Sequence, residues 1–438
     1  MSKGFESRLA AFDLIKAVSE EGAYANLVTP QVLEKSKLSE QDKAFSTELV
    51  YSTIRMSGKY DFLITHYSER DISEIDIKLL ILLRLGAHQI FGMRTPIHAA
   101  INETVEVGKK VVGQSKASFL NALLRRFSEI TDLDDFIDAK VKDPIDNSSI
   151  KYSHPRWIIQ SYLDRLNDLE SVNELLRANN VAAAPNLIAW PNLSTKEEIL
   201  TEGGKEIDFT RYGVEATKPP HLYKSINERR AGVQDAGSQY VVEMAFETSH
   251  SDSKWLDMCA APGGKAKYLY ELLQGKNFQA NEINEKRFNL LKKYLPVKVL
   301  TNKDGTQYGN FNSKFDRILI DAPCTGLGAL RRRPEARWRK TPNDLKTLVK
   351  LQSELLQSAA HLLEPGGVIA YATCSPHLLE TKVQIADFLQ RHKEFRIRPI
   401  EDAKRGKVKG LESDGSLQLW THRDGTDSMF LVLLESTT

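Results

Sequence analysis

Apolar residues recur at helical spacing throughout the first third of the chain. The runs RLAAFDLIKAV, DKAFSTELVYSTIR, DIKLLILLRLGAHQIF and ASFLNALLRRF all place apolar side chains three and four residues apart, and glycine or proline falls between them. This pattern predicts a compact helical domain over residues 1–135. The stretch that follows, residues 136–150, is acidic and loop-like and is predicted to be a linker.

Residues 151–230 carry a mixed pattern. The segment PRWIIQSYLDRL has helical periodicity, whereas PNLIAWPNL is a short apolar run between two prolines, which is typical of a strand. We therefore predict a small α+β domain between the helical domain and the rest of the chain.

From residue 231 to 438, short apolar runs alternate with helical patterns. KWLDM, FQANEI, FDRILIDA, GGVIAYATC and SMFLVLLES are expected strands, and amphipathic runs such as KAKYLYELLQ and NDLKTLVKLQSELLQSAAHLL lie between them. Such alternation predicts an α/β domain, a Rossmann-like parallel sheet with helices on both faces. Ligands bind beyond the carboxyl ends of the strands in such sheets, so residues just after these runs are expected to share one crevice.

Composition supports a soluble protein of several domains. The chain has 438 residues, 41% of them hydrophobic and 27% charged, and no apolar run reaches the ~18–20 residues that span a bilayer. Its start has no secretory-signal pattern. Three cysteines without a CxxC pair give neither a disulfide framework nor a zinc site. We expect a reduced, cytoplasmic, metal-free protein without membrane contact.

The formal net charge of +2 neither demands nor excludes nucleic acid, but one local run stands out. The sequence RRRPEARWRK over residues 331–340 holds six basic side chains, one acid and Trp338. Such a run is usually a solvated face. Arginines beside an aromatic ring can also grip phosphates and stack on a base.

The loop DMCAAPGGK over residues 257–265 follows the first expected strand and contains a Pro-Gly-Gly turn. A phosphate-binding P-loop is excluded because Cys259 occupies its first glycine position and Ala266 follows Lys265, and the dinucleotide pattern GxGxxG is absent. Two acids follow the next expected strands. Alone, Glu282 reads as a surface acid and Asp304 as a turn residue, but their order fits the ribose and adenine of an adenosine-containing cofactor.

The remaining two cysteines follow separate expected strands. Cys324 comes after Asp321 and a proline in IDAPC, and Cys374 ends YATC. One such cysteine is more often a small buried side chain than a reactive one. A pair at neighbouring strand ends favours chemistry, for which a thiol of pKa ~8.5 needs a nearby cation or helix N-terminus.

Together, DMCAAPGGK, DAPCTGLGALRRRPEARW and YATCS resemble the signature of the RNA cytosine-carbon-5 methyltransferases, which use S-adenosylmethionine. The segments RANNVAAAPNLIAWPNLS and AGVQDAGSQY are similar to the small domain that precedes the catalytic domain in the RsmB (Sun) branch. The helical first 130 residues resemble the NusB-like RNA-binding domain of that branch. The resemblance implies a monomeric enzyme that acts on small-subunit ribosomal RNA.

Carried over by position, the resemblance implies a role for each residue. Cys374 would be the nucleophile, Cys324 would help release the product, and Asp321 and Lys265 would polarise the pyrimidine. Glu282 stands where many relatives have Asp. The implied cofactor-binding residues are Cys259, Ala260, Ala261, Pro262, Gly263, Gly264, Lys265, Glu282, Asp304 and Asp321, and the implied RNA-binding residues are Arg331, Arg332, Arg333, Arg337 and Trp338.

Two other hypotheses remain. A non-catalytic RNA-binding or assembly factor could keep the fold without cofactor binding, and the complete set of motif residues argues against it. A Rossmann oxidoreductase is disfavoured by the missing GxGxxG pattern.

Overall fold

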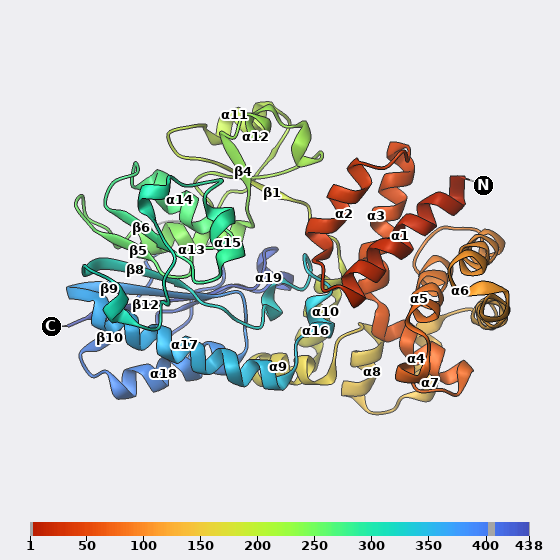
Figure 1. Cartoon of the computed structure of the whole chain (residues 1–438). Helices are drawn as coiled ribbons and strands as arrows, with labels where there is room; N and C mark the ends of the chain where they lie inside the picture. Colours follow the sequence, from red (N-terminus) through yellow and green to blue (C-terminus); the bar gives the residue numbers. More distant parts are fainter. Residues whose placement is uncertain (1–2, 402–407, 438) are drawn as a thin grey trace. The chain divides into compact units, whose positions relative to one another are not determined.

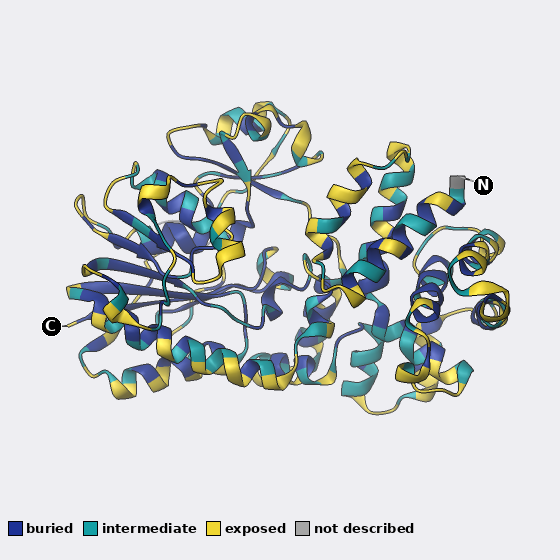
Figure 2. Cartoon of the chain, viewed as in Figure 1, coloured by how far each residue is buried: buried dark blue, intermediate teal, exposed yellow. Residues whose placement is uncertain are grey.

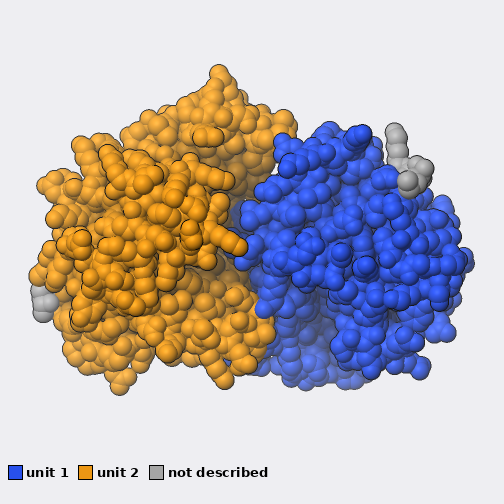
Figure 3. All heavy atoms as spheres, in the orientation of Figure 1, with its two compact units in different colours: residues 1–181, 330–339 blue, residues 182–329, 340–438 orange. Residues whose placement is uncertain are grey.

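The computed structural model describes residues 3–401 and 408–437. Two compact units divide the chain (Figure 3). The first contains residues 1–181 together with the short segment 330–339, and the second contains residues 182–329 and 340–438. Each unit is therefore made of two separate segments of the chain.

The first unit is helical (Figure 1). Its core is built around α5, whose sequence IKLLILLRLGAHQIF is apolar on most faces, so α5 is buried along most of its length. Its helices are α1 (Lys3–Glu20), α2 (Ala25–Glu34), α3 (Glu40–Arg55), α4 (Ser57–Ser68), α5 (Ile77–Phe91), α6 (Ile97–Phe127), α7 (Leu133–Lys140), α8 (Pro144–Lys151), α9 (Arg156–Leu166), α10 (Leu169–Asn180) and α16 (Ala336–Arg339).

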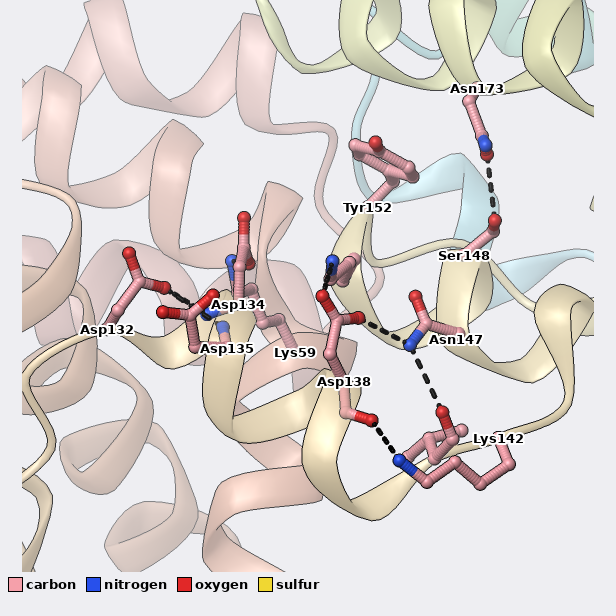
Figure 4. Close-up of polar contacts among 12 residues, drawn as sticks. Lys59, Asp132, Asp134, Asp135, Asp138, Lys142, Asn147, Ser148, Tyr152 and Asn173 are labelled. Carbon is pink, nitrogen blue, oxygen red and sulfur yellow. Dashed lines mark hydrogen bonds and ion pairs between the residues drawn. The ribbon is translucent and has the colours of Figure 1, made fainter.

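The stretch 136–150 is helical and not the loop-like linker that its composition predicted, since α7 and α8 fill most of it. Aspartates in this stretch and just before it act as helix caps: Asp132 accepts from two backbone N–H groups of α7, and Asp143 accepts from one of α8. Asp138 then joins the two helices by accepting from Asn147 (2.7 Å), as Figure 4 shows, and from Lys151 (2.6 Å). The acidic character thus reflects capping and pairing within the helical unit.

A small antiparallel sheet opens the second unit, with the order β2-β3-β1-β4. Leu187 and Val214 lie in its core, and both are fully buried. The middle α+β domain predicted from sequence is therefore present, although the helices expected at its start belong to the first unit. Its elements are β1 (Asn186–Ala189), α11 (Lys196–Thr201), β2 (Lys205–Glu206), β3 (Gly213–Glu215), α12 (Lys224–Asn227) and β4 (Ala231–Val233).

The large sheet has the order β10-β12-β9-β8-β5-β6-β7, with β11 paired to β12. Strands β5 to β9 pair in parallel, as predicted, but β12 pairs antiparallel with β9, β10 and β11, so the sheet is mixed. Its strands are β5 (Trp255–Asp257), β6 (Phe278–Asn281), β7 (Leu300–Thr301), β8 (Phe315–Asp321), β9 (Leu363–Thr373), β10 (Phe395–Arg398), β11 (Leu417–Gln418) and β12 (Phe430–Ser436).

Helices cover both faces of this sheet, and its central strands are buried (Figure 2). Strand β9 shows why: Val368, Ala370 and Ala372 enter one core, and Ile369 and Tyr371 enter the other. The helices are α13 (Ala236–Phe246), α14 (Gly264–Leu272), α15 (Glu285–Leu291), α17 (Pro342–Leu362), α18 (Lys382–Arg391) and α19 (Thr421–Asp424). Across the described residues, none of the helices combines the length and the apolarity that crossing a membrane requires.

Candidate active site

The two thiols outside the glycine loop meet at one edge of the large sheet. Strands β8 and β9 are parallel neighbours, with Asp321 in register with Ala372. Their carboxyl ends therefore lie side by side, and the loops that follow bring the Sγ atoms of Cys324 and Cys374 to 3.3 Å. Both side chains are half-buried. The arrangement puts two thiols within reach of a single small group.

An ion pair lies at the same edge. Lys265, at the start of α14, donates to Asp321 at the end of β8 with an Nζ–Oδ2 distance of 2.9 Å. Burial acts to lower the pKa of Lys265, but the charge and hydrogen bond of Asp321 outweigh it, and negative charge on Cys374 raises this pKa further. Lys265 therefore keeps its charge, and by the same interaction it favours the thiolate of Cys374.

The surroundings of Cys324 disfavour its thiolate. Its hydrogen bond with Cys374, its burial and the nearby carboxylates all raise the pKa of the Cys324 thiol well above the usual range. The pKa of the Cys259 thiol is also raised, chiefly by burial and by Asp257. These shifts disfavour the thiolates of Cys324 and Cys259.

The glycine loop brings backbone close to this edge. Gly263 has φ +120°, a conformation that disfavours any side chain, and an added Cβ would approach Tyr294 to 3.1 Å. Helix α14 begins directly afterwards, so the first N–H groups of the helix have no partner within it. The wrapping of a cofactor by residues 259–265 stays a prediction, and these free N–H groups are the donors it would use.

The sequence reading missed Asp257, the last residue of β5. Its side chain is fully buried, and neither carboxylate oxygen has a hydrogen-bond partner among the described residues. Burial, with the charge of Asp321, raises the pKa of Asp257 to about 8. An unpaired buried acid at the carboxyl end of the first parallel strand suits a polar or cationic ligand group. Its position at a strand end was the available signal.

The other two predicted cofactor acids differ in environment. Glu282 is buried after β6, where it accepts from the backbone N–H of Asn284 at 2.9 Å and lies 3.5 Å from Arg287. Asp304 caps its own turn by accepting from the N–H and hydroxyl of Thr306 (3.0 and 2.7 Å). Glu282 is thus a buried acid that accepts from its own turn and lies near a cation, and Asp304 has the contacts of an ordinary turn residue. Their roles at the ribose and the adenine stay predictions.

Replacing Asp257 with asparagine should change how stability depends on pH. A carboxyl with a pKa of about 8 in the folded state and 3.8 in the unfolded state binds more protons when folded between those values. Its contribution to stability therefore falls as pH rises from about 4 to 8, by a few kcal/mol in all. Asp257→Asn should abolish this fall, which melting temperatures at several pH values will show. Parallel profiles for the two proteins would contradict it.

The basic segment 330–339 is packed within the helical unit, and this corrects part of the predicted RNA-binding set. Arg337 is fully buried and donates to the carbonyl oxygens of Arg55 (3.1 Å) and Ser153 (3.0 Å) and to Asn180 Oδ1 (2.9 Å). The indole N–H of Trp338 donates to the carbonyl of Ile54 at 3.0 Å. Arg337 thus has a structural position, and Trp338 has its polar atom engaged, while Arg333 is exposed and Arg331 and Arg332 are half-buried.

Two protein families and several curated methyltransferases are similar to this chain. The family described as 16S rRNA methyltransferase RsmB/F matches residues 244–435, and the NusB family matches residues 6–129. A putative methyltransferase of Mycobacterium tuberculosis is 39% identical over 99% of this chain and 97% of its own length. A probable ribosomal RNA small subunit methyltransferase B of Bacillus subtilis is 28% identical over 96% of both.

Solved structures agree on the fold. The crystal structure of PH0851 matches all of both chains with a TM-score of 0.81 at 23% identity. The structure of NSun6 from Pyrococcus horikoshii with SFG matches 65% of this chain and 98% of its own, with a TM-score of 0.53 at 17% identity. The fold is thus that of a Rossmann-like methyltransferase with a NusB domain before it. The chain belongs to the 16S rRNA methyltransferase RsmB/F family.

Proposed function

We propose that this methyltransferase moves a methyl group from S-adenosylmethionine to carbon 5 of a cytosine in small-subunit ribosomal RNA, through a covalent adduct at Cys374. The observation that carries the proposal is the pair of thiols at 3.3 Å beside the Lys265–Asp321 ion pair. A reaction with only a nucleophilic step would need one cysteine. The proposed reaction needs two groups, one to add to carbon 6 of the ring and one to help remove the proton from carbon 5.

The chemistry follows from the weak nucleophilicity of cytosine carbon 5. The Cys374 thiolate adds to carbon 6 and makes carbon 5 enamine-like, which divides one hard step into easier ones. S-adenosylmethionine supplies an electrophilic methyl group on a sulfonium. Once carbon 5 carries the methyl, Cys324 or a base that it positions removes the carbon-5 proton. The electrons return to the ring and expel the Cys374 thiolate. Lys265 and Asp321 polarise the pyrimidine.

The cofactor would be held by the loop 259–265, with Asp257 behind it and with Glu282 and Asp304 at the ribose and adenine. The cytosine must leave its stack to reach the thiols, at a cost of roughly a few kcal/mol, and less in single-stranded RNA. Of the four arginines in the predicted RNA-binding set, Arg331, Arg332 and Arg333 are not fully buried and are the ones that would contact phosphates. The NusB-family domain provides a further RNA-binding surface, and we expect a monomer to suffice.

The test uses Cys324→Ala protein, unmethylated small-subunit RNA and S-adenosylmethionine. Without the release group, the methylated cytosine should remain attached to Cys374, so a protein–RNA band should survive a denaturing gel. The same band should disappear in the Cys324→Ala/Cys374→Ala double variant.

Absence of a band with RNA shown to be bound would contradict release by Cys324. Methylation by the wild type on intact ribosomal particles then separates the remaining cases. Methyl transfer on particles would show that the protein is a methyltransferase whose substrate is the particle and not free RNA. No transfer would favour a non-catalytic RNA-binding or assembly factor.

A further inference from the structure

Behind the two thiols lies a buried carboxylate that no step of the proposed reaction uses. Glu380 ends the short 3₁₀ turn Leu378–Glu380 that follows the Cys374 loop, and it is fully buried. One of its oxygens accepts from the backbone N–H of Thr325 at 2.8 Å and from Gln352 Nε2 at 3.1 Å. The other accepts from the Thr325 hydroxyl. The carboxyl group thus accepts three hydrogen bonds from two neighbouring residues.

The bonds to Glu380 hold Cys324 from both sides. Thr325 follows Cys324 directly, and Gln352 Nε2 also donates to the carbonyl of Pro323, which precedes Cys324, at 2.9 Å. Both peptide groups that flank the thiol are therefore fixed, one by Glu380 itself and the other by its partner on α17.

The same network reaches Cys374. The Thr325 hydroxyl lies 3.1 Å from the hydroxyl of Ser375, the residue after Cys374. The backbone N–H of Gly328 donates to the carbonyl of Cys374 at 2.8 Å, and Tyr371, on the strand before it, donates its hydroxyl to the carbonyl of Glu380 at 3.0 Å. The two cysteine loops are thus joined through groups that water does not reach.

We propose that Glu380 is a positioning residue, which holds the Cys324 loop against the Cys374 loop and so sets the separation of the two thiols. It touches neither thiol and acts on their spacing through Thr325 and Gln352, while its charge is one of those that raise the pKa of the Cys324 thiol. A displacement of about 1 Å at a reacting group can cost about 10²-fold in rate, so a fixed spacing matters if both thiols serve one base. In this respect the inference rests on the proposed function.

Glu380→Ala should lower kcat for methyl transfer about 100-fold and leave the RNA KM and the cofactor Kd within about threefold of wild type. Glu380→Gln should recover kcat to within about tenfold of wild type. Its amide oxygen can accept from Thr325 N–H and Gln352, and its amide N–H can donate to the Thr325 hydroxyl. A Gln variant as slow as the Ala variant would overturn positioning by hydrogen bonds.

Glu243 on α13 provides a matched control. It is also a buried carboxylate of the same unit, where it accepts from Arg211 N–H and the Tyr268 hydroxyl, each at 2.9 Å, away from the thiols. Glu243→Ala should lower the melting temperature and leave kcat within about threefold of wild type. An equal fall in kcat for both Ala variants would mean a general loss of structure and would overturn the proposal.

Thiol spacing can be measured without RNA. Phenylarsine oxide reacts with two thiols: two As–S bonds form, and the oxygen leaves as water with the two thiol protons, so the reagent bridges closely spaced thiols. Intact mass should show one bridge in wild type and in Glu243→Ala, and at least tenfold weaker bridging in Glu380→Ala. Unchanged bridging would overturn the proposal. If Glu380→Ala loses the bridge as expected but the wild type transfers no methyl group, the result would instead reject the proposed function alone.

If Glu380→Ala does not fold, Thr325 offers a milder test. Thr325→Val keeps the shape but removes the hydroxyl that contacts both Glu380 and Ser375, and kcat should fall about tenfold. Thr325→Ser keeps the hydroxyl and should stay within about threefold of wild type. Equal kcat values for these two variants would overturn the proposal.

Discussion

Replacing Cys374 with alanine should lower methyl transfer by about 10⁴-fold or more, because no other group can add to carbon 6 of the cytosine. Cys374 is the cysteine whose surroundings combine partial exposure with the charge of Lys265. Cys324 lies only 3.3 Å away, but its raised thiol pKa disfavours the thiolate that addition needs. Transfer of labelled methyl groups to unmethylated RNA measures the effect.

Cys374→Ser is the matched variant for this experiment. A hydroxyl keeps the size and hydrogen bonding of the side chain but is a far weaker nucleophile than a thiolate, so its loss of activity should equal that of the Ala variant. Both variants should bind cofactor and RNA as wild type does. Substantial methyl transfer by Cys374→Ala would assign the nucleophile elsewhere, with Cys324 as the next group to test.

The alternation of strand and helix patterns after residue 231 was enough to predict a Rossmann-like domain, because strands buried on both faces read as continuous apolar runs. The carboxyl-end rule then predicted that Cys324, Cys374, Asp321 and Lys265 would lie at one edge. The 3.3 Å approach of the two thiols could not be predicted, since it depends on the register of β8 with β9 and on contacts of Glu380.

The acidic stretch 136–150 shows where local composition misleads. Aspartate favours loops and helix N-caps for the same reason, namely that its short carboxylate binds nearby backbone N–H groups. Asp132 and Asp143 are caps, and Pro144 stands at the first turn of α8, where its missing N–H costs nothing. Composition alone does not distinguish these uses.

The run RRRPEARWRK failed as a guide for a different reason. The local sequence does not show which of its arginines face solvent and which are buried. The partners of Arg337 lie 157 to 282 residues away in the chain. Only the tertiary structure reveals that this segment, which follows the Cys324 loop in sequence, packs with the helical unit.

Arg337→Ala should therefore reduce the stability of the helical unit by about 3 kcal/mol and should not act first on RNA binding. Four acceptors in α3, α10 and the turn after α8 would lose a charged donor, at about 1–3 kcal/mol for each buried acceptor left unpaired. Burial, with the charge of Arg55, lowers the pKa of Arg337 to about 9, so removing the charge returns part of this cost. Urea unfolding followed by circular dichroism measures the balance.

Two further variants separate the contributions to this effect. Arg337→Met keeps much of the side-chain volume and removes the charge, so it should lose less stability than Arg337→Ala, and the difference measures packing. Arg333→Ala removes an exposed arginine of the same run and should leave stability within about 0.5 kcal/mol of wild type, while weakening RNA binding if that residue contacts phosphate. An Arg337→Met protein as stable as wild type would show that hydrogen bonds to the guanidinium contribute nothing net. The segment would then be held by Trp338 and Arg339, whose own hydrogen bonds reach the carbonyls of Ile54 and Val18.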